Sequence, residues 1–104
     1  MTMYRQGDVL IVSVKEIPQE AAKLPDDNGR TILAYGEVTG HAHALKKDEA
    51  TLYAANDNTF LRVVSAEAWL RHEEHDPIYI PAGNYRVIRQ REYDDSGEIR
   101  YVAD

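Results

Sequence analysis

The sequence predicts a mainly β fold, a compact antiparallel barrel or sandwich of about six to eight short strands with one short helix. Turn-forming residues recur at short intervals, and the segments between them are rich in Val, Ile, Tyr and Thr, which favour strands. The chain has seven tyrosines against one phenylalanine, which suits sheet surfaces where a ring packs and its hydroxyl reaches water. Its 104 residues contain no linker-like stretch, so a single β-rich domain over residues 1–104 is expected.

The first strands are predicted by alternation of apolar and polar residues. Residues 7–14 (GDVLIVSV) predict a strand that is partly covered on both faces. A connection follows, and it ends in the turn-forming run Asp26-Asp27-Asn28-Gly29. Residues 31–45 (TILAYGEVTGHAHAL) then predict one long strand.

A hairpin and a meander are predicted after the long strand. Residues 51–55 and 59–64 flank Asn56-Asp57-Asn58, which predicts a hairpin with a short polar loop. Residues 77–104 carry turn signals at Pro81-Ala82-Gly83-Asn84 and Asp94-Asp95-Ser96-Gly97 and predict a three-strand meander.

The short helix is expected within residues 65–75 (SAEAWLRHEEH). Ser65 is a suitable N-cap, and the following alanines and glutamate are tolerated or favoured in helices. Pro77 disfavours helical geometry at Asp76, so the helix is expected to end there. Trp69 is expected to anchor this helix in the core, because a lone large aromatic residue on a short helix normally supplies its buried area.

Composition limits the classes of function. The chain has no cysteine, which excludes thiolate metal sites and cysteine nucleophiles. No stretch approaches the roughly 18 apolar residues of a membrane span and no signal peptide is recognised, so a cytoplasmic protein without a membrane partner is expected. The net charge of −6 makes nucleic acid an unlikely partner. Arg86, Arg89 and Arg91 nevertheless form a local basic strip that could bind a protein partner or a second copy of the chain.

The four histidines of the chain lie in two short segments, as His41-x-His43 and His72-x-x-His75. On a regular strand, His41, His43 and Glu37 would share one face, with the Cα atoms of His41 and His43 about 6.5–7 Å apart. The second pair shares a face if it lies on a helical turn. Imidazole and carboxylate ligands without sulfur suit zinc, iron or manganese. The sequence therefore predicts a divalent transition-metal site made by the four histidines, with Glu37 as a fifth candidate ligand.

The carboxylates beside the second histidine pair are candidates for catalysis. Glu73 and Glu74 could act as a general base on metal-bound water or orient a ring N–H. The spacing of His72 and His75 is not that of the His-Glu-x-x-His protease motif. These residues favour a metal-dependent hydrolase or oxygenase. A non-enzymatic protein-binding or assembly module remains the alternative, and weak binding of single-stranded nucleic acid is a third interpretation.

Several strings resemble a group of small bacterial and phage-encoded domains that have no known activity. They are QGDVL (6–10), GEVTGHAHAL (36–45), HEEHDPIYIPAGNYRVIRQREY (72–93) and RYVAD (100–104). The resemblance covers most of the chain and implies phage association, but no activity, cofactor or substrate.

A looser similarity links Gly36, His41, His43 and Glu49 to the first motif of the cupins, which implies a β-barrel that holds a metal. The spacing from Gly36 to His41 is one residue short, and Glu49 lies farther along than that motif places its glutamate. The chain is therefore cupin-like at most.

Overall fold

Two antiparallel sheets and one separate hairpin make up the fold. A computed structural model describes residues 2–36, 38, 40–89, 91–93 and 99–101, the last two segments by their backbone. The six-stranded sheet has the order β1-β2-β10-β7-β6-β3, formed by Met3–Gln6, Val9–Ser13, Gly83–Arg89, Asn58–Val63, Ala50–Ala55 and Ala22–Lys23. The four-stranded sheet has the order β4-β5-β8-β9, formed by Arg30–Tyr35, Ala42–Lys46, Trp69–His72 and His75–Tyr79. The hairpin pairs β11 (Arg91–Tyr93) with β12 (Ile99–Tyr101).

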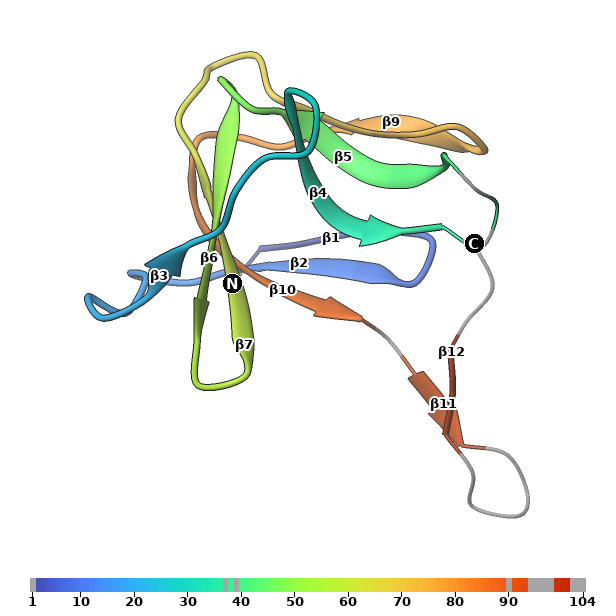
Figure 1. The fold of residues 1–104 in the computed structure, drawn as a ribbon, viewed down its shortest axis with the longest axis horizontal. Coiled ribbons are helices and arrows are strands. Elements are labelled where there is room, and N and C mark those ends of the chain that lie inside the picture. Colours follow the sequence, from blue (N-terminus) through green and yellow to red (C-terminus); the bar gives the residue numbers. More distant parts are fainter. Residues whose placement is uncertain (1, 37, 39, 90, 94–98, 102–104) are drawn as a thin grey trace.

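The inner faces of the two sheets share one hydrophobic core. Ile11 and Leu61 contribute from the six-stranded sheet, Leu45 and Leu70 from the four-stranded sheet, and each is at most 1% exposed. Strand β1 runs beside β9 and β4 beside β6, but no hydrogen-bonded ladder joins the sheets within the described residues (Figure 1). The prediction of a mainly β antiparallel fold is confirmed, and the arrangement is not a closed barrel.

The predicted hairpin around Asn56 is confirmed. Strands β6 and β7 pair antiparallel, and Ala55 lies opposite Asn58. Asn56 and Asp57 have φ angles of 50° and 66°, as a two-residue turn of type I′ requires. Asn and Asp tolerate this left-handed conformation better than other residues with a Cβ, which explains the composition of the loop.

The long strand predicted over residues 31–45 is wrong, because the chain reverses within it. Strands β4 and β5 are the two arms of an antiparallel hairpin. The Gly36 amide donates to the His41 carbonyl over 2.8 Å, and Gly40 has a φ of 87°, which favours glycine. The two glycines that were interpreted as strand interior therefore flank a turn, and His41 directly precedes β5.

The predicted helix over residues 65–75 is also wrong, because residues 65–68 form a loop and residues 69–75 belong to the β8–β9 hairpin. Ala68 and Leu70 are fully buried and His72 is 7% exposed, so the inward positions recur every second residue. A two-residue turn, Glu73-Glu74, joins the strands. Trp69 points outward, is 36% exposed and packs against Tyr79 with ring centroids 5.6 Å apart. It is not the core anchor, because burial with a period of two outweighed local helix propensity.

The predicted C-terminal meander is wrong in its first pairing, whereas the pairing of its last two segments is confirmed by the β11–β12 hairpin. Strand β9 pairs with β8, whereas β10 crosses to the other sheet and pairs with β2 and β7. The turn predicted at residues 94–97 lies outside the described residues. The described part of the chain contains no helix, and so none long and apolar enough to cross a membrane.

Leu70→Ala tests the strand assignment of β8. Leu70 is fully buried, so truncation is expected to lower the free energy of unfolding by about 2–5 kcal/mol through lost burial and a cavity. Val64→Ala is the control, because Val64 is 63% exposed and its truncation should change stability by less than about 0.5 kcal/mol. Urea denaturation measures both, and equal losses would contradict the inward position of Leu70.

Candidate functional site

The two histidine segments meet in space. His43 lies in β5, His72 ends β8 and His75 begins β9, and β5 is paired with β8. The ring centroid of His72 is 4.3 Å from that of His43, 4.8 Å from that of His75 and 5.8 Å from that of His41. Two histidine pairs that lie about thirty residues apart in the chain thus form one group of four imidazoles, the histidine cluster.

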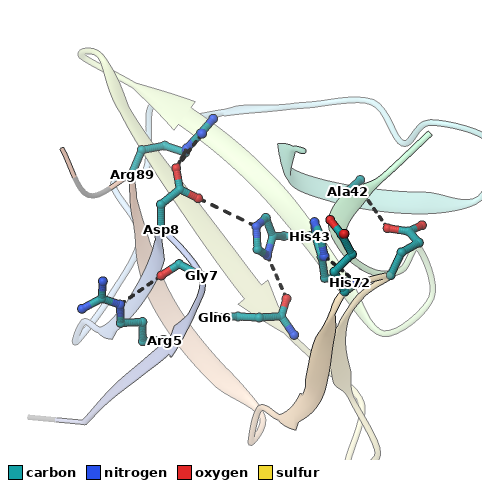
Figure 2. Close-up of polar contacts among 10 residues, drawn as sticks. Arg5, Gln6, Gly7, Asp8, Ala42, His43, His72 and Arg89 are labelled. Carbon is teal, nitrogen blue, oxygen red and sulfur yellow. Dashed lines mark hydrogen bonds and ion pairs between the residues drawn. The ribbon is translucent and has the colours of Figure 1, made fainter. Parts of the chain in front are cut away.

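A buried carboxylate contacts this cluster from the other sheet. Asp8 lies in the turn between β1 and β2 and is 0% exposed. Its Oδ2 accepts from Nε of Arg89 at 2.7 Å and lies 2.6 Å from Nη2 of the same side chain. Its Oδ1 lies 3.8 Å from Nε2 of His43, which is also fully buried (Figure 2). The Arg89 guanidinium compensates the buried charge, and the second oxygen faces the imidazole.

Gln6 fixes the orientation of His43. Its amide nitrogen donates to the carbonyls of Leu70 and Asp76, each over 3.0 Å, which leaves its Oε1 as an acceptor. Nδ1 of His43 lies 2.9 Å from that oxygen (Figure 2). Because Oε1 of Gln6 can only accept, Nδ1 of His43 carries a proton and donates it in this hydrogen bond.

His72 has the opposite polarity. The Glu74 backbone amide donates to its Nδ1 over 3.0 Å, so the neutral ring carries its proton on Nε2. That nitrogen packs against the backbone at Gly36, where an added Cβ would come within 3.1 Å of Nε2 and of the His41 Cβ. The absence of a side chain at residue 36 lets the β4–β5 turn approach this close.

Two histidines of the cluster lie close to a carboxylate. His41, His72 and Glu73 offer ligand atoms that all lie within 4.8 Å of one another. The Ala42 amide donates to Oε1 of Glu73 over 2.9 Å, and this hydrogen bond is the main reason why the pKa of Glu73 lies below its ordinary value. Glu74 places its Oε2 3.4 Å from Nδ1 of His41. A histidine pair and a carboxylate therefore converge at the edge of the cluster.

The other predicted ligands lie beside these three residues or outside the residues that the structure describes. His43 and His75 belong to the cluster but not to the three-ligand group. Nε2 of His75 is buried and has no hydrogen-bond partner among the described residues. Glu37 lies outside the described residues. Glu49, the cupin-like candidate, accepts from the Lys46 amide over 3.0 Å instead of joining the histidines.

The structure does not bring the predicted arginine strip together. Arg86 and Arg89 are three residues apart on β10 and therefore point to opposite faces of the sheet. Arg86 donates to Oδ1 of Asn58 over 2.9 Å, while Arg89 contacts Asp8. The side chain of Arg91 is not among those that the structure describes.

Gln6 and Asp8 are the residues that the sequence analysis missed. Both belong to the string QGDVL, but Gln6 was noted only for the family resemblance of that string and Asp8 was interpreted only as part of the predicted strand over residues 7–14. A usable signal was the charged residue directly before a fully apolar strand, since such a residue is either exposed in a turn or buried with a partner.

Comparison with known proteins places the chain in a family. Residues 5–90 match a domain of unknown function, DUF8820. The chain belongs to this family. No curated protein and no solved structure matches it. The match to DUF8820 spans both histidine segments as well as Asp8 and Arg89, and it confirms the resemblance to a family without known activity.

Arg89→Ala is expected to destabilise the fold by about 2–4 kcal/mol, because it leaves the Asp8 carboxylate buried without its cation. Arg86→Ala is the matched control on the same strand, since the hydrogen bond of Arg86 to Asn58 is exposed and its loss should cost under about 1 kcal/mol. Chemical denaturation of both variants tests this. Equal stability of the two would show that Asp8 does not depend on Arg89.

Proposed function

We propose that this chain is a metal-binding domain in which His41, His72 and Glu73 hold one divalent transition metal. The observation that carries the proposal is the approach of their three ligand atoms to within 4.8 Å. Ligands around a tetrahedral zinc ion lie closer, since each bond is about 2.0–2.1 Å long. Small rotations of the exposed Glu73 and of His41, which is a quarter exposed, would close the set.

The composition of the ligand set indicates the chemistry. Two histidines and one carboxylate bind catalytic zinc in hydrolases and non-haem iron in oxygenases, and both kinds of site keep open positions. Bound zinc would lower the pKa of a coordinated water and supply a hydroxide nucleophile. Zinc or manganese supports hydrolysis and iron supports oxygen chemistry, so the identity of the metal decides between the two predicted activities.

The carboxylate of Glu74 suits a supporting role. With Oε2 3.4 Å from Nδ1 of His41, it is placed to accept a hydrogen bond from that nitrogen. Such a contact fixes the ring and leaves Nε2 as the ligand, as carboxylate–histidine pairs do in other metal sites. Glu74 is therefore proposed as the residue that positions His41, and Glu73 as a ligand instead of a free base.

Ligation by His72 has a cost within the β8–β9 turn. Its Nδ1 accepts the Glu74 amide, which places the proton on Nε2 and leaves neither nitrogen with an available lone pair. A metal at His72 must displace either that amide or that proton. Metal binding is therefore expected to release a proton or to rearrange the turn.

Isothermal titration of tag-free protein with Zn²⁺, Mn²⁺ and anaerobic Fe²⁺ tests the proposal. One equivalent of metal is expected to bind the wild type, and His41→Ala should weaken binding by about a hundredfold through loss of a ligand. Glu73→Gln should also weaken binding while it keeps the oxygen that accepts the Ala42 amide.

Glu67→Gln is the control for loss of one negative charge, because Glu67 lies in an exposed turn away from the cluster. Unchanged affinity in this variant is expected. The proposal fails if the wild type binds none of the three metals, or if His41→Ala binds them as tightly as the wild type.

Gly36→Ala probes the same site without removing a ligand. Its Cβ would lie 3.1 Å from Nε2 of His72 and from Cβ of His41, so both side chains must give way by a few tenths of an ångström. A loss of about tenfold in metal affinity is expected, with the fold retained. Circular dichroism and the same titration measure both properties, and unchanged affinity would mean that neither ring takes part in ligation.

A further inference from the structure

A hollow lies on the four-stranded sheet directly beside the proposed ligands. Its volume is about 430 Å³, within the range of small-molecule sites. It is lined by Arg30, Ala42, Ala44, Leu45, Lys46, Arg71, His72 and Glu73. We call it the basic hollow.

The sequence of β5 explains why the sheet is hollowed here. Ala42, Ala44 and Lys46 are two residues apart and lie on one face of the strand. Arg30 on β4 is opposite Lys46, and Arg71 on β8 is opposite Ala44. Long basic side chains from three neighbouring strands thus surround two alanines, whose small side chains leave the space between them open.

The charge of the basic hollow is opposite in sign to that of the chain. The chain carries −6, yet three cations line this site and only one carboxylate does. That carboxylate, Glu73, lies 4.0 Å from Nη1 of Arg30 through its Oε2. The neighbouring Glu49 lies 3.6 Å from Nη1 of Arg71. The site keeps a positive surplus after both carboxylates are counted.

Hydrogen-bond donors remain available in the basic hollow. A guanidinium has five N–H donors, and Arg71 donates one of them to the Trp69 carbonyl over 3.1 Å. The ammonium of Lys46 forms no ion pair with any described residue. Arginine and lysine side chains around a small pocket are the groups that recognise carboxylate and phosphate.

We propose that the basic hollow binds a small organic anion. Its carboxylate or phosphate lies among Arg30, Lys46 and Arg71, and its apolar body lies over the alanines of β5. His72 and Glu73 line the same hollow, so the body of the anion reaches the proposed metal site. The role of the anion as substrate rests on the proposed function. Its binding in the basic hollow is independent of that function.

Binding of the anion and of the metal should reinforce each other. Glu73 is negative and lines the hollow, so it repels an anion until a metal neutralises it. If the metal raises the affinity for the anion, the anion must raise the affinity for the metal by the same factor, because coupling is reciprocal.

The test uses phenyl phosphate, benzoate and benzyl alcohol as probes against the whole chain freed of metal by EDTA and dialysis. Titrations at low ionic strength follow the amide NMR signals of Ala42 and Ala44. An anionic probe is expected to bind, benzyl alcohol to bind at least tenfold more weakly, and Arg71→Ala and Lys46→Ala to weaken the anion about tenfold each. The tighter of the two anions identifies the recognised group.

Three further variants separate this proposal from a general charge effect and from the metal site. Ala44→Leu keeps every charge but fills the hollow, so it should abolish binding, whereas Arg86→Ala on the other sheet should leave it unchanged. In His41→Ala, metal binding should be lost and anion binding kept. In Lys46→Ala, metal binding should be kept and anion binding weakened about tenfold. Equal binding of benzyl alcohol, or anion binding that survives both Arg71→Ala and Lys46→Ala, overturns the proposal.

Discussion

The candidate site depends on a carboxylate that is completely removed from water. Desolvating a charged group costs several kcal/mol unless a countercharge and hydrogen bonds compensate it. Asp8 is held by Arg89, whose guanidinium reaches in from the end of β10, where Arg89 is paired with Val9. The ion pair therefore ties the β1–β2 turn to the neighbouring strand of the same sheet. This leaves Oδ1 directed at His43 in the opposite sheet.

Gln6 extends this constraint from one sheet to the other. Its amide donates to two carbonyls of the β8–β9 hairpin, and its oxygen accepts from His43 on β5. A buried polar group that is fully hydrogen-bonded specifies one arrangement, since any shift leaves a donor or acceptor unsatisfied. The positions of the strands that carry the histidines are therefore fixed by polar contacts at one end of a core that is otherwise apolar.

The sequence predicted the local features that depend on residue type, and it failed where tertiary packing decides. The Asn56-Asp57 turn was predictable because few residues accept a positive φ. The β8–β9 hairpin was not, because Ser65 and its following alanines suit a helix, and only the buried positions of Leu70 and His72 reveal a period of two. The grouping of all four histidines in two short segments was also a local feature, and it predicted that they form one site. The burial of Asp8 beneath Arg89 joins residues 81 positions apart and carries no local signal.

The hydrogen bond between the Glu74 amide and His72 links metal binding to the Glu73-Glu74 turn. His43 donates through Nδ1 to Gln6. His72 accepts through Nδ1 from the Glu74 amide and carries its proton on Nε2. That same turn supplies the Glu73 carboxylate to the proposed ligand set. A metal that binds His72 must therefore displace either the Glu74 amide or the Nε2 proton, while the Glu73 side chain of the same turn joins the ligand set. Metal affinity is then the free energy of ligand bonding minus the cost of that displacement, and the Glu73-Glu74 turn contributes to both.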